Sequence, residues 1–379
     1  MGENAFIAFG LAALGIGWQQ RLGAVFVSGV LFLLLAVLKI RPWLANSISP
    51  SMKHSFAAGI GMFLALIGLY ETGIICSAAE GMPAKALLMP DGITIGAPPI
   101  PVKLGNIHEL KVLIAIGGTL LTAVLMARRV KGAMIIGIIA CALAGYFLGV
   151  GEAPKAIFSL PFVGDYSIDP ILFKLDIHSV LKISFLPILL TLFLMSFLDT
   201  LSTLVGVGTN CGMVDEEGNL VEVEKPMVVD AAACMFSALI GSSTSGAFIE
   251  SAAGVREGAR TGLSTIFVAL FFFVSFFFIP LLEPLQHLKF AYGPALICVG
   301  LLMVGSVQKI NVEDPTEAFP AFATIAMMCF TYSIANGLTA GLVLYVAMKL
   351  LTGRAKDLKG GSIVLAALCL VYFVFGLPH

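Results

Sequence analysis

Residues 241–254 read Gly-Ser-Ser-Thr-Ser-Gly-Ala-Phe-Ile-Glu-Ser-Ala-Ala-Gly, and this stretch decides the fold. It opens with a Gly/Ser/Thr tract, which can keep its backbone out of a helix. The apolar run around it, 245–256, is too short to cross ~30 Å of hydrocarbon as a helix, and it carries one carboxylate, Glu250. Such an element is tolerated at membrane depth only where neighbours bury it or where it lines a cavity. We therefore interpret it as a broken helix beside a polar site.

The composition supports a membrane protein. Hydrophobic residues make up 59% of the chain and charged residues only 12%, against about 25% charged residues in soluble domains. The apolar runs are apolar on every face, unlike the alternating strands of a membrane barrel. A net charge of -1 offers no basic surface for nucleic acid. The seven cysteines form no metal-like CxxC pattern, so we expect no metal and no cofactor. We predict an all-α polytopic membrane protein.

Further apolar runs give the predicted spans, which are 5–16, 22–38, 56–79, 110–126, 133–150, 183–207, 228–240, 245–256, 262–282, 292–307, 317–334, 337–351 and 362–376. Lys and Arg gather in alternate loops, which we expect on the cytoplasmic side. The longer loops 80–109 and 152–182 should face outward. Insertion has to come from the spans themselves, because no signal peptide is visible.

Three segment pairs indicate an internal repeat. Ala5-Phe6-Ile7 matches Ala247-Phe248-Ile249, residues 23–27 match 264–268, and residues 64–68 match 301–305, all at an offset of about 240 residues. The loop charges give the two copies opposite orientations, and inverted repeats are typical of secondary transporters with a site at the repeat interface. Two spans before the second copy have no partner in the first, so we expect about two N-terminal spans to be missing.

Two carboxylates within the spans are the leading site candidates, because an acid at the bilayer centre costs on the order of 3 kcal/mol. Asp199 lies in an apolar run, with Thr200 next to it and Thr203 about one helical turn further on. Glu250 lies where the Gly/Ser/Thr tract enters the half-helix. A half-helix that begins in the membrane directs backbone N–H groups at a solute. The nearby hydroxyls and aromatic rings complete the candidate set, which adds Thr200, Thr203, Ser243, Thr244, Ser251, Phe248 and its repeat mate Phe6. Helix packing is the alternative role for each of these side chains.

This set suits a flat heterocycle with ring N–H donors. An ionised carboxylate only accepts hydrogen bonds, so it pairs with such donors and disfavours anions. Burial favours the neutral form of a carboxylate. Glu250 and Asp199 are thus also the candidates for binding a proton on one side of the membrane and releasing it on the other.

At these same residues the chain resembles the adenine/guanine/hypoxanthine permease branch of the xanthine/uracil permease (nucleobase–cation symporter) superfamily. The motifs are Phe197–Gly206, Ile249–Gly254 with Gly258–Leu263, and Pro320-Ala-Phe with Tyr332-Ser-Ile. The resemblance implies fourteen segments in two inverted repeats of seven, divided into a core domain and a gate domain. It also implies proton-coupled purine uptake with Asp199 and Glu250 as substrate ligands, and it places Asn4 in the third-segment motif Gly2-Glu-Asn-Ala5.

On this basis residues 1–150 hold segments three to seven and 183–351 hold segments eight to fourteen. Residues 151–182 form an outward-facing loop, and 352–379 form a cytoplasmic loop with a C-terminal apolar segment. The first two segments are then absent, which indicates an N-terminal truncation or a misassigned start. We expect a multi-pass protein of the plasma membrane (a bacterial inner membrane) that contacts purine, protons and lipid; homodimer formation stays open.

Three other interpretations remain. A uracil, xanthine or anion carrier would keep the fold, although Glu250 argues against an anion. An intramembrane aspartyl protease would use two acids, but neither Asp199 nor Glu250 lies in a Gly-x-Gly-Asp or Tyr-Asp setting, and we predict no enzyme. The last is a truncated remnant that does not transport, which the upstream reading frame would distinguish from a complete permease.

Overall fold

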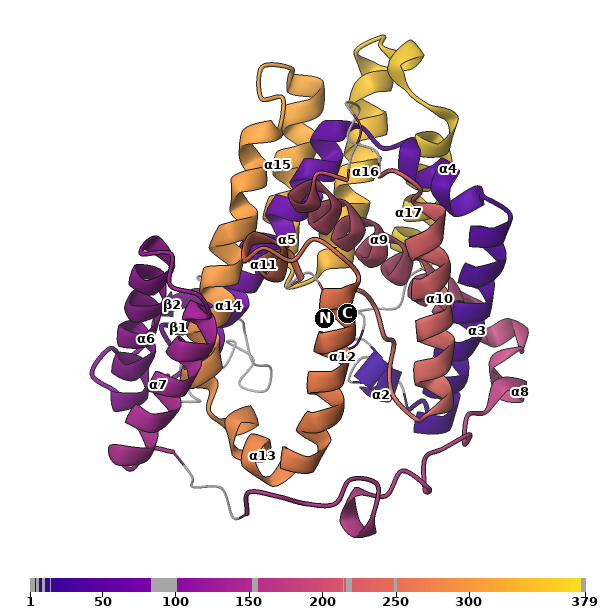
Figure 1. Cartoon of the computed structure of the whole chain (residues 1–379). Coiled ribbons are helices and arrows are strands. Elements are labelled where there is room, and N and C mark those ends of the chain that lie inside the picture. Colours follow the sequence, from indigo (N-terminus) through magenta and orange to yellow (C-terminus); the bar gives the residue numbers. More distant parts are fainter. Residues whose placement is uncertain are drawn as a thin grey trace, which may run out of the picture. The chain divides into compact units, whose positions relative to one another are not determined.

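The computed structural model describes residues 4, 7–8, 11–13, 15–82, 101–151, 156–213, 215, 220–248 and 251–375 (Figure 1). Helices dominate these ranges. Five are long and apolar enough to cross a membrane, namely 18–37, 50–71, 110–127, 263–285 and 289–309, and three shorter apolar helices cover 133–147, 336–351 and 360–371. The prediction of a largely helical chain with many apolar segments is confirmed.

The helices in chain order are α2 (Leu11–Ala13), α3 (Trp18–Val37), α4 (Ile40–Asn46), α5 (Pro50–Glu71), α6 (Leu110–Ala127), α7 (Ala133–Phe147), α8 (Ile177–Val180), α9 (Leu186–Cys211), α10 (Glu224–Leu239), α11 (Ser251–Arg256), α12 (Leu263–Ser275), α13 (Ile279–His287), α14 (Lys289–Val304), α15 (Pro315–Phe330), α16 (Ile334–Leu351) and α17 (Gly360–Phe375). Two short strands, β1 (Ile75–Ser77) and β2 (Val102–Leu104), pair antiparallel with Cys76 opposite Lys103. This hairpin is an addition to the helical fold that periodicity did not predict.

The span expected over 56–79 ends earlier than predicted. Helix α5 stops at Glu71, where the Thr72 hydroxyl donates to the carbonyl of Gly68 at 2.8 Å. Gly73 then adopts a φ of 75°, the left-handed conformation that commonly terminates helices. Glu71 therefore lies at the helix end.

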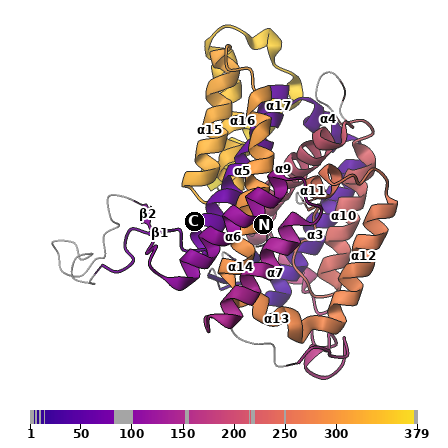
Figure 2. The same cartoon turned by 60° about the vertical axis from the view of Figure 1, so that its left-hand side comes forward.

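The chain divides into two compact units. The larger consists of Met1–Phe63, Phe162–Gly262 and Met303–His379. In it α3 and α10 run side by side (Figures 1 and 2). Their approach is close, because a Cβ added at Gly29 would lie 2.8 Å from Cγ of Met235. Small residues at such contacts are typical of helix packing in membranes. One buried apolar cluster of this unit comprises Ile7, Leu11, Ala24, Val25, Val180, Ile188, Leu192 and Ala238.

The smaller unit consists of Leu64–Pro161 and Leu263–Leu302. Its helices α6 and α7 meet where Gly118 faces the thiol of Cys141 and Gly137 faces the hydroxyl of Thr122. Helix α12 buries none of its residues within the chain. An exposed apolar surface on a helix is typical of a segment that faces lipid. Each unit combines segments from both predicted repeat copies, and the inverted repeat with its core and gate domains stays a prediction.

Candidate functional site

The broken element expected from 241–254 lies between α10 and α11. Helix α10 ends at Leu239, and Gly241 follows with a φ of 85°. The backbone of 242–248, here called the extended tract, is not helical, and α11 begins at Ser251. The amide of Ser242 donates to the carbonyl of Ser237 at 2.8 Å, which ties the start of the tract to the last turn of α10.

The tract meets the N-terminal segment through Asn4. The hydroxyls of Ser243 and Thr244 both donate to Oδ1 of Asn4, at 2.5 and 2.6 Å. With the amide oxygen accepting twice, the NH₂ of Asn4 is the group that can donate to a solute. Three predicted site residues are thus brought together from positions about 240 apart in the chain.

Helix α9 supplies a second group of predicted residues. Thr200 and Thr203 are buried, while Asp199 is half-buried near the middle of this helix of 26 residues. The half-helix α11 packs against α9. Asp199 therefore lies on the helix that contacts the half-helix, in the same unit as Asn4.

Asp230 is a candidate site residue that the sequence analysis missed. It lies on α10, is only 6% exposed, and its Oδ2 accepts a hydrogen bond from Oγ1 of Thr200 at 2.7 Å. Its other oxygen, Oδ1, faces the extended tract, because a Cβ added at Gly246 would lie 3.7 Å from it. The sequence did contain a signal, because Asp230 is an acid inside the apolar run 228–240. Its position near the start of that run resembles that of an acid at the solvated end of a span.

The remaining predicted site residues are either exposed or outside the described residues. Phe248 is exposed at the end of the tract, and Ser251 is the exposed first residue of α11. Phe6 and Glu250 lie outside the described residues, so their roles stay predictions. Within the described residues, no group of three or more His, Cys, Asp and Glu side chains is arranged to hold a metal ion.

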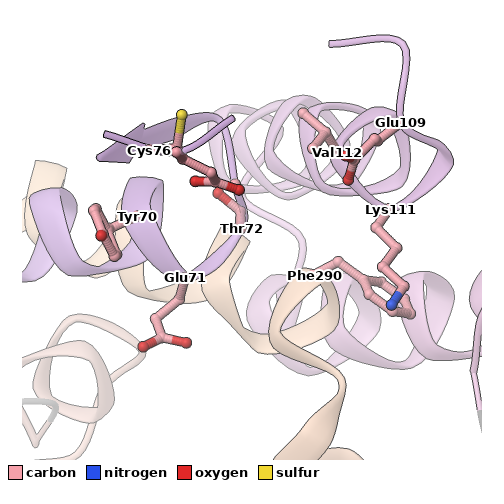
Figure 3. A pocket seen from close by; sticks show the side chains of 10 residues that line it. Tyr70, Glu71, Thr72, Cys76, Glu109, Lys111, Val112 and Phe290 are labelled. Carbon is pink, nitrogen blue, oxygen red and sulfur yellow. The ribbon is translucent and has the colours of Figure 1, made fainter. Parts of the chain in front are cut away.

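A cavity of ≈ 220 Å³ in the smaller unit holds none of the predicted residues (Figure 3). It lies where the end of α5 meets the start of α6 and is lined by Tyr70, Glu71, Thr72, Gly73, Cys76, Glu80, Glu109, Lys111, Val112 and Phe290. Glu71 already forms an ion pair with Lys289 at 2.6 Å. We therefore place the candidate site in the larger unit, at Asn4, the extended tract, Asp199, Thr200 and Asp230.

Comparisons with known proteins agree on one family. Residues 4–341 match the family described as "Permease family", the model for xanthine and uracil permeases. The chain is 40% identical to a putative permease of Methanocaldococcus jannaschii, aligned over 95% of this chain and 77% of the relative. It is 34% identical to adenine permease AdeQ of Escherichia coli (97% and 77%) and 35% identical to guanine/hypoxanthine permease PbuO of Bacillus subtilis (97% and 81%).

Proposed function

Because the chain belongs to the xanthine/uracil permease family, with relatives named adenine and guanine/hypoxanthine permeases, we propose that it takes up purine nucleobases by proton-coupled secondary transport. The proposal places it in the plasma membrane as a multi-pass protein, with purine, protons and lipid as its partners. It is a transporter and not an enzyme.

The observation that carries the proposal is the contact of Asn4 with Ser243 and Thr244. This contact joins a polar amide, two hydroxyls and non-helical backbone within a chain of apolar helices. Non-helical backbone at membrane depth is tolerated where it is buried in protein or lines a cavity. A purine offers ring nitrogens and exocyclic groups in one plane, which match donors and acceptors of this kind.

The carboxylates supply the complementary chemistry. Asp199 on α9 and Glu250, which precedes α11 in the sequence, would accept hydrogen bonds from purine N–H groups. A carboxylate that alternates between a buried and a hydrated environment changes its proton affinity. Proton binding at one face and release at the other would then couple the proton gradient to uptake. Asp230 adds a third acid, which would orient the Thr200 hydroxyl beside Asp199.

Uptake of radiolabelled adenine, guanine, hypoxanthine and uracil tests the proposal in cells that lack their own nucleobase permeases. We expect purine uptake that rises at acidic external pH and is lost in Glu250→Gln. The matched control is Glu257→Gln, an exposed acid just after α11 that should transport like the wild type. Uptake of uracil alone would shift the proposal to a uracil permease of the same fold. A well-expressed protein that transports no nucleobase would refute the proposed function.

A further inference from the structure

Arg21, in the first turn of α3, uses its guanidinium on main-chain carbonyls. Nη1 donates to the carbonyl of Ala8 at 2.8 Å and to that of Ile7 at 3.3 Å. Its Nε is buried and has no hydrogen-bond partner in the part of the chain that the structure describes. A basic residue that only anchored the helix at the membrane surface would keep its guanidinium in water. The Arg21 side chain instead reaches back across thirteen residues of chain.

The two carbonyls belong to residues three and four positions after Asn4. Residues 4, 7 and 8 are helical in the part of the chain that the structure describes. A guanidinium beside these carbonyls satisfies them as hydrogen-bond acceptors. Ile7 is buried in the apolar cluster that also holds Val25 of α3. Arg21 thus adds hydrogen bonds to an apolar contact, and together they fix residues 7 and 8 to α3.

An arginine also contacts main-chain carbonyls beside α11. Nη1 of Arg260 donates to the carbonyl of Val255, near the end of α11, at 2.7 Å, and to that of Ala259 at 3.1 Å. The two arginines differ in reach, because Arg260 contacts carbonyls at most five residues away, whereas Arg21 joins residues 7 and 8 to the long helix α3.

We infer that Arg21 is a positioning residue for the solute site. By fixing the carbonyls of Ile7 and Ala8 it holds Asn4 where its oxygen accepts from Ser243 and Thr244, which leaves the NH₂ of Asn4 to donate to the solute. Arg21 itself need not touch the solute; it acts through Asn4. This inference rests on the proposed purine site, and it assigns a role to a residue that neither the repeat nor the acids in the spans point to.

A double-mutant cycle on the full-length protein tests it, since residues that act as one unit give non-additive effects. Purified Arg21→Met, Arg21→Lys, Asn4→Ala and the double variant Asn4→Ala/Arg21→Met are compared for adenine binding and for the KM and Vmax of uptake. We expect Arg21→Met to weaken binding about tenfold, as for the loss of a hydrogen bond to a charged group. Arg21→Lys should recover most of this, because an ammonium also donates to carbonyls. Gln19→Met, an exposed neighbour in the same turn, is the control.

Non-additivity decides the outcome. In the Asn4→Ala background, Arg21→Met should change binding less than twofold. A full tenfold effect there, or no effect in the chain with Asn4, would overturn the inference. If Arg21→Met does not fold, the same cycle is run with Arg21→Lys, whose smaller effect must likewise vanish without Asn4.

A second measurement does not depend on purine. Cysteines placed at Asn4 and Thr244, in a chain whose native cysteines are replaced by Ser, should be joined efficiently by a short bifunctional thiol reagent. Arg21→Met should lower that yield severalfold, and Gln19→Met should not. An unchanged yield would overturn the positioning role. If the wild type takes up no purine but the cross-linking yield still depends on Arg21, the proposed function is refuted and the positioning role of Arg21 is retained.

Discussion

The hydroxyl of Thr200 lies 2.7 Å from Oδ2 of Asp230, and both side chains are buried. This hydrogen bond joins α9, which carries Asp199, to α10, which leads into the extended tract. The thiol of Cys234, one turn further along α10, donates to the carbonyl of Ser245 at 3.2 Å. Helix α10 therefore supports both the acid-bearing helix and the non-helical tract.

Removing the Thr200 hydroxyl should destabilise this arrangement. Thr200→Val keeps the side-chain shape but leaves the buried Asp230 carboxylate without that donor, at a cost of roughly 1–3 kcal/mol. Thr200→Ser retains the donor and is the matched control. Thermal unfolding followed by size-exclusion chromatography should rank wild type and Thr200→Ser above Thr200→Val. Equal midpoints for the two substitutions would mean that the hydrogen bond contributes nothing to stability.

Asn4→Asp should separate the two faces of the Asn4 amide. An aspartate still accepts hydrogen bonds from Ser243 and Thr244, but it has no NH₂ to donate to the solute. We expect normal expression and stability with a KM for purine uptake raised about tenfold or more. Asn4→Ala, which lacks both functions, should also lower stability. A KM for Asn4→Asp equal to that of the wild type would mean that the NH₂ of Asn4 makes no contact with substrate.

Two glycines beside the tract should respond differently to alanine. Gly241 has a φ of 85°, and a Cβ there would lie 2.7 Å from Cβ of Ile171, so Gly241→Ala meets both backbone strain and a clash. The strain alone costs on the order of 1 kcal/mol. A Cβ at Gly246 would make only an ordinary 3.7 Å contact with Asp230, so Gly246→Ala should fold normally. Melting temperatures of the two variants check this order, and equal values would contradict it.

A buried ion pair fixes α15 to α16. The ammonium of Lys349 lies 2.9 Å from Oε1 of Glu317, with both side chains largely buried, and Oε2 of Glu317 accepts from the hydroxyl of Ser49 at 2.7 Å. Removing one partner of a buried pair is costly, and Asp314, whose Oδ2 lies 3.8 Å from the Lys349 ammonium, offsets only part of the remaining charge. Glu317→Gln should therefore lower the free energy of unfolding by about 3 kcal/mol, measured by chemical denaturation in detergent. Glu313→Gln, at an exposed acid nearby, is the control.

Acid titration of the neighbouring Asp314 should affect stability but not transport. Hydrogen bonds from Thr316 hold the pKa of the Asp314 carboxyl below its usual value, with smaller contributions from Lys349 and Arg354. A lowered pKa means that its stabilisation is complete above about pH 4, the value of an unfolded aspartate, and is lost as pH falls through the folded value. Between pH 5 and 8 the group stays ionised.

Asp314→Asn should therefore lower thermal stability above about pH 4, where the wild-type carboxylate is ionised, and this difference should shrink as the pH falls below that value. It should leave the pH profile of uptake between pH 5 and 8 unchanged. Melting curves and uptake measured over the same pH series check both statements. A shift of the uptake profile in this variant would place part of the proton dependence outside the proposed site.

The sequence alone located much of the fold and part of the site. Most of the apolar runs predicted their helices within a few residues, with 56–79 and 245–256 as exceptions. The composition of 241–248 predicted the break before α11. Contacts between distant segments were harder to predict. The repeat pointed to the neighbourhood of Asn4 and the extended tract, but nothing local to Arg21 indicates that its side chain reaches Ala8.

Errors in the sequence prediction have physical causes. The span at 56–79 was drawn too long because residues 72–79 are still apolar on average, whereas Gly73 ends the helix through its backbone conformation. Asp230 was overlooked because an acid near the start of a run resembles a solvated terminus. Its 6% exposure and its hydrogen bond with Thr200 show it to be an interior group.

The hydrogen bond from the Cys234 thiol to the carbonyl of Ser245 makes the reactivity of this thiol depend on the position of the extended tract. A thiol that is buried and engaged with the tract reacts slowly with alkylating reagents, since reaction needs an accessible thiolate. Any state in which residues 242–248 move away from α10 would uncover it. The rate of Cys234 alkylation, measured by mass spectrometry relative to that of half-exposed Cys76, would therefore report opening and closing of the site without an introduced probe.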